Sequence, residues 1–193
     1  MSKVTEAFTE YKTSLGFWLY LMTDCILFAS LFATYVVLTQ GTAGGPGPSD
    51  IFQMPLVLAE TLILLTSSLT CGLAMIALHK KQLKQTIAWL VATYVLGVAF
   101  LTIELTEFGT LITEGHSWQA SAFLSAFFVL VGTHGLHIFI GLIWLLVMTT
   151  VLLRRGFTEK TRRQMGLFAM FWHFLDLVWI FIFTVVYLMG VAV

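Results

Sequence analysis

Five long, continuously apolar stretches constrain this chain of 193 residues more than any other feature. A helix needs about 20 apolar residues to cross a hydrocarbon core about 30 Å thick, and each stretch is long enough. The hydrophobicity is continuous rather than alternating, which argues against the strands of a membrane β-barrel. We therefore expect an all-α integral membrane bundle of five transmembrane helices in a single membrane domain, residues 1–193, with spans at about 15–39, 51–78, 86–108, 121–153 and 165–191.

The composition agrees with a membrane location. Charged residues make up 10% of the chain, whereas a soluble domain usually carries about 25%. The net charge is zero, so nothing indicates a nucleic-acid partner. Residues 1–14 are of mixed polarity, and no short apolar segment with a small-residue cleavage site follows them. We therefore expect the first span to be retained rather than removed as a signal peptide.

The positions of the basic residues predict the orientation of the spans. All ten Lys and Arg residues lie in the N-terminal tail, the second loop or the fourth loop. Because Lys and Arg accumulate on the cytoplasmic side, this distribution places the N-terminus in the cytoplasm. With five spans the C-terminus is then periplasmic, and an even number of spans would break the alternation.

Seven ionisable residues lie inside the predicted spans. Ionisable groups in hydrocarbon are costly, and each is by default a hypothesis of function. No Lys or Arg lies within a span, so the carboxyl groups have no intramembrane cation except an imidazolium, and desolvation favours their neutral form. An anion transporter would be expected to place a cation there. The seven residues are Asp24, Glu60, Glu104, His134, His137, His173 and Asp176.

Counting residues along each span gives the depth of these groups, at a rise of about 1.5 Å per residue. Asp24, His134, His173 and Asp176 fall at similar depths in the inner half of the membrane. The same count places Glu60 and Glu104 in the outer half, with Glu107 near the outer end of the third span. We expect Asp24 to form a hydrogen bond with a histidine of the fourth or fifth span.

These polar groups support three interpretations. His134 and His137 are three residues apart and could form half of an iron, copper or manganese site, but they lack the HExxH or ExxH context of helical metal sites. A proton pathway would need a connected chain of groups across the bundle. Hydrogen bonding between helices explains the pattern more simply. We expect an intramembrane polar network of structural or proton-related function, with no catalytic, cofactor-binding or metal-ligating residue.

Two long motifs carry a family resemblance. GTHGLHIFIGLIW (Gly132–Trp144) and WHFLDLVWIFIFTVVYLMG (Trp172–Gly190) resemble the last two helices of subunit III of the haem–copper respiratory oxidases. FLTIELTEF (Phe100–Phe108) resembles the acidic helix of that family, and FWLYLMTDCILFASLFATYVV (Phe17–Val37) resembles the helix with its buried carboxylate. The resemblance covers about residues 15–191.

Further motifs indicate the quinol-oxidase branch of this family. GTAGGP (Gly41–Pro46) and ETLILLTSSLTCGLA (Glu60–Ala74) resemble that branch, and TDCILF, with Asp24 at the position of the buried carboxylate, is most similar to the bo-type ubiquinol oxidases. Cytochrome c oxidase members often have seven helices and a Glu at this position. Lipid sites that depend on the two additional helices therefore do not transfer to this chain.

The resemblance implies a role without a redox centre. In this family the complex transfers electrons from ubiquinol to O2 and pumps protons across the bacterial inner membrane. Haems and copper belong to subunit I, whereas subunit III supports assembly, stability and lipid packing. We therefore expect subunit I as the main contact, subunits II and IV as further partners, and bound phospholipid.

Two other functions fit the composition. A stand-alone transporter or proton channel would have an aqueous cavity lined by Asp24, Glu60 and Glu104, but the sequence has no repeats or paired broken helices. A small membrane enzyme would have a metal site made of histidine and carboxylate ligands. Metal analysis of the isolated chain would identify such an enzyme.

Overall fold

The computed structural model describes residues 3–45 and 47–192, and the side chains of residues 11–45, 47–48 and 51–191. Pro46 of the GTAGGP motif therefore lies outside the description. The elements in chain order are α1 (Lys3–Leu38), α2 (Pro48–Ile51), α3 (Met54–His79), α4 (Leu83–Thr113), α5 (Ala122–Arg155), α6 (Glu159–Ile182), the π-helical turn η1 (Phe183–Leu188) and α7 (Met189–Ala192).

Over the described residues the protein is all-helical, and five helices are long and apolar enough to cross a membrane. The predicted fold class is confirmed. Several helices extend beyond the apolar stretches, because the polar residues at their ends continue the helix. Helix α4, the third long helix, reaches from Leu83 to Thr113 instead of 86–108. Helix α6, the fifth, begins at Glu159 rather than near residue 165. The second long helix, α3, begins at Met54 rather than at residue 51, because the non-helical residues 52–53 separate α2 from α3.

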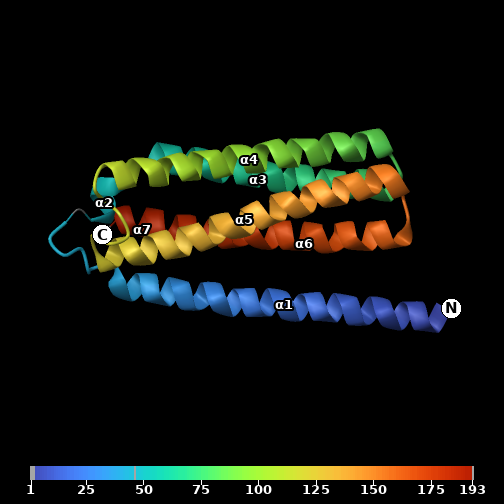
Figure 1. The fold of residues 1–193 in the computed structure, drawn as a ribbon, viewed down its shortest axis with the longest axis horizontal. Coiled ribbons are helices and arrows are strands. Elements are labelled where there is room, and N and C mark those ends of the chain that lie inside the picture. Colours follow the sequence, from blue (N-terminus) through green and yellow to red (C-terminus); the bar gives the residue numbers. More distant parts are fainter. Residues whose placement is uncertain (1–2, 46, 193) are drawn as a thin grey trace.

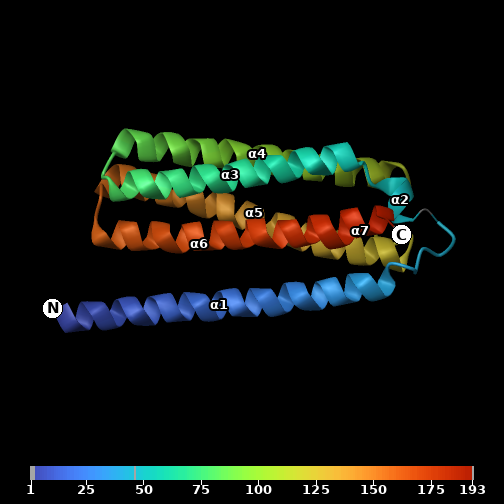
Figure 2. The ribbon, with the colours of Figure 1, turned by 180° about the vertical axis from the view of Figure 1, so that it is seen from behind.

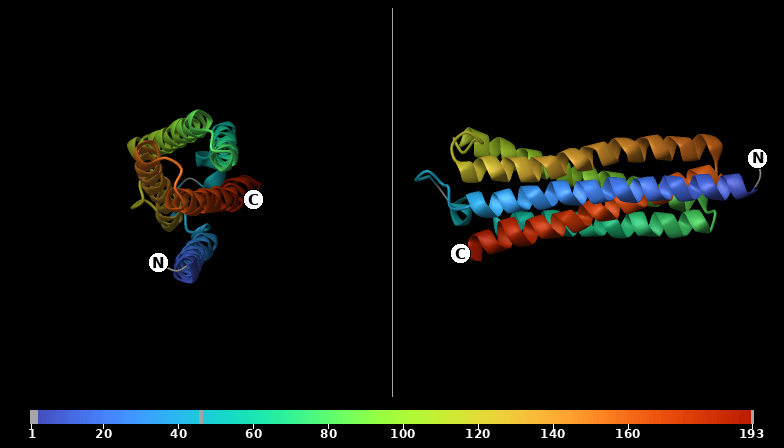
Figure 3. Two further views of the ribbon diagram at one scale, coloured as in Figure 1. Left: turned by 90° about the vertical axis from the view of Figure 1, so that its right-hand side faces the viewer. Right: turned by 90° about the horizontal axis from the view of Figure 1, so that it is seen from below.

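Helices α3, α4, α5 and α6 form a compact four-helix bundle, and α1 lies against one side of it (Figure 1). The end-on view in Figure 3 shows α1 outside the four-helix arrangement. Figure 2 shows that α6, η1 and α7 form one continuous rod beside α3. Helix α1 contacts α5 and α6. Its polar side chains Asp24 and Tyr35 therefore reach the bundle from one side only.

The two ends of the bundle differ in charge. The N-terminus, the α3–α4 turn and the α5–α6 turn lie at the same end, and the C-terminus lies at the other (Figure 1). The loops with basic residues therefore gather at one end of the molecule, as an alternating topology of five spans requires. Gly156, which has a φ of 65°, ends α5 in a conformation that favours glycine.

A large indole ring and two glycines account for the close packing of the bundle centre. Trp172 of α6 is 1% exposed and lies between Gly97 of α4 and Gly141 of α5. Its Nε1 donates a hydrogen bond to Ser67 Oγ of α3 at 3.2 Å. One side chain thus contacts all three neighbouring helices, and small residues permit this close approach.

Candidate functional site

Asp24 and His137 form a polar contact between α1 and α5. Asp24 Oδ2 lies 3.8 Å from His137 Nε2, and both side chains are largely buried. The His137 Nδ1 lies 2.7 Å from the carbonyl oxygen of Thr133, which orients the ring. The expected histidine therefore comes from the fourth span. The contact is an ion-pair distance, however, and the predicted direct hydrogen bond is not formed, because 3.8 Å exceeds hydrogen-bond length.

His134 has a different environment, although it lies only three residues before His137. It is fully buried and stacks on Trp179 of α6 at a ring-centroid distance of 5.3 Å. Phe100 of α4 packs edge-on against the same imidazole at 6.0 Å. Neither ring nitrogen has a hydrogen-bond partner among the described residues. His134 is therefore enclosed by aromatic rings inside the bundle, whereas His137 faces α1.

His173 and Asp176 form a third environment, on the surface between α3 and α6. The His173 Nδ1 is hydrogen-bonded to Ser68 Oγ of α3 at 2.7 Å. These three side chains line a shallow cavity of about 370 Å³. The groups predicted at one depth therefore do not make a single cluster. Asp24 pairs with His137, and among the described residues neither forms a hydrogen bond or ion pair with His173 or Asp176.

Glu60 and Glu104 lie deep in the bundle, with Glu107 beside them. Glu60 is 0% exposed and Glu104 is 2% exposed. Glu104 lies against Gly135 of α5 so closely that a Cβ there would be 2.7 Å from Glu104 Oε1. Both Glu60 oxygens and one oxygen of each other carboxyl lack hydrogen-bond partners within the described chain. Tyr187 of η1, which sequence reasoning missed, belongs to the same centre.

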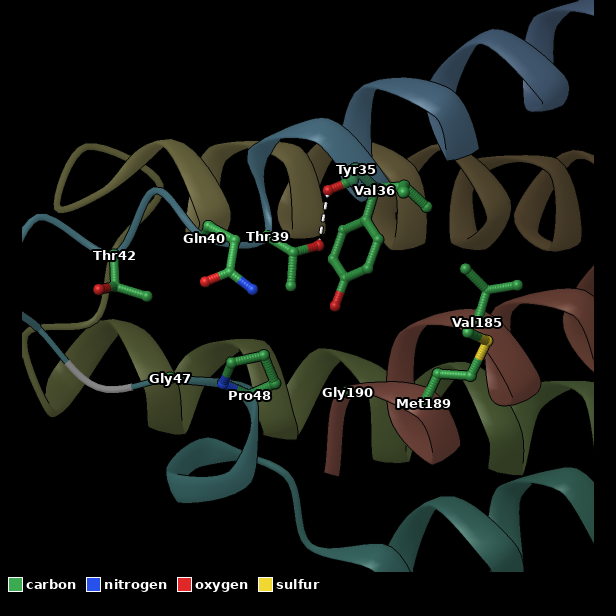
Figure 4. Close-up of a pocket in the computed structure, with 10 residues that line it drawn as sticks. All are labelled: Tyr35, Val36, Thr39, Gln40, Thr42, Gly47, Pro48, Val185, Met189 and Gly190. Atoms are coloured by element: carbon green, nitrogen blue, oxygen red, sulfur yellow. Dashed lines mark hydrogen bonds between the residues drawn. The ribbon is translucent and has the colours of Figure 1, made fainter. Parts of the chain in front are cut away.

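A cavity of about 460 Å³ lies between the C-terminal end of α1 and the η1–α7 segment (Figure 4). Tyr35 points from α1 into this cavity, and Val185 and Met189 line the opposite wall. The Tyr35 hydroxyl donates a 3.4 Å hydrogen bond to the carbonyl oxygen of Val186. Thr42 and Gly47 of the loop before α2 also line it. A cavity between α1 and the bundle was not predicted, because the sequence does not show how the spans pack.

The histidines lie in three separate environments. His134, His137 and His173 have separate neighbours, and no three His, Cys, Asp or Glu side chains of the described residues are arranged to hold a metal ion. The interpretation of His134 and His137 as half of a metal site therefore has no support from the geometry. The polar groups bind one another across helices, or they are enclosed within the bundle.

Comparisons with known proteins agree with this architecture. The family model described as cytochrome c oxidase subunit III matches residues 4–191. Cytochrome bo(3) ubiquinol oxidase subunit 3 of Pseudomonas aeruginosa is 58% identical over 179 residues, which cover 93% of this chain and 86% of the relative.

Relatives with other names are similar at lower identity. Quinol oxidase subunit 3 of Bacillus subtilis is 45% identical over 178 residues, 92% of this chain and 87% of the relative. Cytochrome c oxidase subunit 3 of Alkalihalophilus pseudofirmus is 45% identical over 179 residues, with the same coverage of 92% and 87%. The predicted resemblance is confirmed, and the chain belongs to the cytochrome c oxidase subunit III family.

Proposed function

We propose that this chain is subunit III of a bo-type ubiquinol oxidase, which transfers electrons from ubiquinol to O2 and pumps protons. The observation that carries the proposal is the 58% identity, over 93% of the chain, to a protein named as that subunit. The family match over residues 4–191 shows that the likeness extends through all five long helices.

In this proposal the chain supports the complex without taking part in the redox chemistry. The residues present do not fit a haem or copper group, because the histidines face separate neighbours across the described chain. We assign the haems and copper to a partner subunit. The chain contributes assembly, stability and lipid packing, which agrees with polar side chains that connect its own helices.

The proposed partners are oxidase subunit I as the main contact, with subunits II and IV, and membrane lipids that include bound phospholipid. Helix α1 supports this because it contacts the bundle on one side, and large apolar side chains such as Leu19, Ile26 and Val37 are exposed on it. Apolar helix faces of this kind suit lipid or another transmembrane helix.

We place the protein in the bacterial inner membrane, with its N-terminus in the cytoplasm and its C-terminus in the periplasm. The gathering of the basic loops at one end of the bundle supports this orientation. A stand-alone transporter or proton channel is less well supported. Glu104 lines a groove between α4 and α5 that includes neither Asp24 nor Glu60, whereas a common cavity was the expectation for a transporter.

Mild-detergent purification of the tagged chain from its native membrane tests the proposal. We expect it to bring down haem-containing subunits, identified by mass spectrometry and by their optical spectrum, together with ubiquinol oxidase activity. The matched control is the same tag on an unrelated five-span protein. Purification of a colourless chain alone would contradict the proposal, and oxidation of cytochrome c instead of ubiquinol would correct the electron donor.

A further inference from the structure

The centre of Glu60, Glu104 and Glu107 combines burial with a shortage of partners. Glu60 comes from α3 and the other two come from α4, and the three groups are near enough to interact electrostatically. In the described chain, no protein group donates a hydrogen bond to either Glu60 oxygen or to one oxygen of each neighbour. Buried polar atoms in folded proteins are nearly always hydrogen-bonded, so these atoms need a partner that is not a side chain.

Tyr187 is a second and independent sign of a binding site. It is 0% exposed, its hydroxyl has no hydrogen-bond partner among the described residues, and it interacts electrostatically with all three carboxyl groups. It lies in the π-helical turn η1, where Phe52 and Trp179 pack against its ring at centroid distances of 4.6 and 6.2 Å. Such turns occur often at functional sites, and the Tyr187 side chain in this one is fully buried.

The charge of the centre decides what it can hold. No Lys or Arg lies in the apolar stretches that contribute these residues, and the α5 residues that line a groove with the Glu104 carboxyl are Gly132, Gly135, Leu136 and Phe139. Three neighbouring carboxylates without a cation would repel one another in a medium that also disfavours each charge. The oxygens are not arranged as a metal site within the described residues. Protons and water molecules remain as the partners that satisfy both charge and hydrogen bonding.

Tyr35 connects this centre with the outer face. Its hydroxyl donates a hydrogen bond to the carbonyl oxygen of Val186, the residue before Tyr187, and its side chain lines the cavity of about 460 Å³ between α1 and α7 (Figure 4). Thr39 and Gln40 line the same cavity and supply polar groups between Tyr35 and the outer end of the protein. These groups form a route from the carboxyl centre through Tyr187 and Tyr35 to the cavity, which lies at one end of the bundle.

We propose that Glu60, Glu104, Glu107 and Tyr187 form a hydrated proton-holding site that exchanges protons with the outer face through the cavity at Tyr35. A carboxylate oxygen takes a proton from a hydronium ion, which gives a neutral acid and a water molecule, and the reverse step returns the proton to water. The proposal concerns groups inside this chain, so it does not depend on which complex the chain joins.

Infrared difference spectroscopy of the purified intact complex tests the site. Subtracting the spectrum of the Glu104→Gln variant from that of the unmodified protein at neutral pH should reveal the C=O band of a protonated carboxylic acid. Glu107→Gln should remove a second contribution. The matched control is Glu159→Gln at the start of α6, because that side chain is 82% exposed and should contribute only to carboxylate bands. Loss of carboxylate bands alone in Glu104→Gln and Glu107→Gln would overturn the proposal.

The unmodified protein supplies a measurement that needs no variant. In D2O the protonated-acid band should shift within the time of buffer exchange, because a hydrated site exchanges its proton. An unshifted band would mean a dry and isolated site, which contradicts the proposal.

The route is tested by the rate of the same exchange. Tyr35→Phe should slow it severalfold, whereas Tyr94→Phe on α4, which does not line the cavity at Tyr35, should leave it unchanged. An equal rate in Tyr35→Phe and the unmodified protein would refute the route through Tyr35.

Discussion

Replacing Gly141 with alanine should destabilise the protein by displacing the Trp172 indole. A Cβ at position 141 would lie 3.0 Å from Cζ3 and 3.2 Å from Cε3 of that ring. On its other side the ring already lies close to the Gly97 backbone of α4, since a Cβ built there would be 3.0 Å from Cη2. Its Nε1 is also held by the hydrogen bond to Ser67. The added methyl group therefore forces a rigid, fully buried side chain to move.

The magnitude follows from the contact and from a matched control. The 3.0 Å distance is about 0.4 Å shorter than the 3.4 Å at which ordinary van der Waals contact begins. Overpacking of a filled core costs about 1–3 kcal/mol. Alanine also gains about 0.8–1 kcal/mol over glycine in helix propensity, which would hide part of this cost. Gly72→Ala on α3 gives the same gain without the clash, because its Cβ would meet no atom within 4 Å.

Equilibrium unfolding in mixed micelles, followed by circular dichroism during titration with SDS, measures this difference. We expect Gly141→Ala to be less stable than Gly72→Ala by about 1–3 kcal/mol. Gly97→Ala combined with Gly141→Ala should cost more than the sum of the single changes, because the two methyl groups press on opposite edges of one ring and each blocks the movement that would relieve the other. Equal stability of Gly141→Ala and Gly72→Ala would refute the argument that the glycines make room for Trp172.

Three further predictions use the same unfolding assay. Ser121→Ala should cost about 1 kcal/mol, because the hydroxyl caps α5 by accepting a backbone hydrogen bond at 3.1 Å, and Ser121→Asp should restore the stability. Trp179→Phe should cost at least about 0.5–1.5 kcal/mol, since it removes the 3.1 Å hydrogen bond from Nε1 to Thr61 Oγ1; additivity with Thr61→Ala would contradict that bond. Asp24→Asn should be destabilising alone but nearly neutral in a His137→Asn background, and equal effects in both backgrounds would show that the two groups are not coupled.

The number and type of the long helices could be predicted because length and continuous hydrophobicity are local properties of the sequence. Their ends could not be read from hydrophobicity alone. Helix α6 begins at Glu159 because Thr158 Oγ1 accepts a hydrogen bond from the Thr161 backbone at 3.1 Å, so capping extends it into polar sequence. Pro55 in the first turn of α3 was an available signal for a start after residue 51. The π-helical turn has no comparable signal.

The polar residues could be found from the sequence, but most of their partners could not. Helical spacing places His134 and His137 on similar sides of α5, yet one faces Trp179 and the other faces Asp24. Which of them reaches α1 depends on the rotation of α5 about its axis, which packing sets. Tyr187 was missed because a tyrosine near the end of a span is usually assigned to the membrane interface.

Two polar contacts at different depths explain how α1 is placed against the bundle. Lipid chains are as apolar as the helix surface, so burial of apolar side chains gives α1 little reason to prefer the bundle over lipid. Asp24 contacts His137 in the middle of α1, and Tyr35 donates a hydrogen bond to the Val186 carbonyl oxygen near the C-terminal end of α1. A single contact would leave α1 free to rotate or tilt about that point, whereas two contacts on different helices fix both movements. Both residues are buried whereas Leu19, Ile26 and Val37 of α1 are exposed, so the contacts that hold the helix also determine which face it presents to its surroundings.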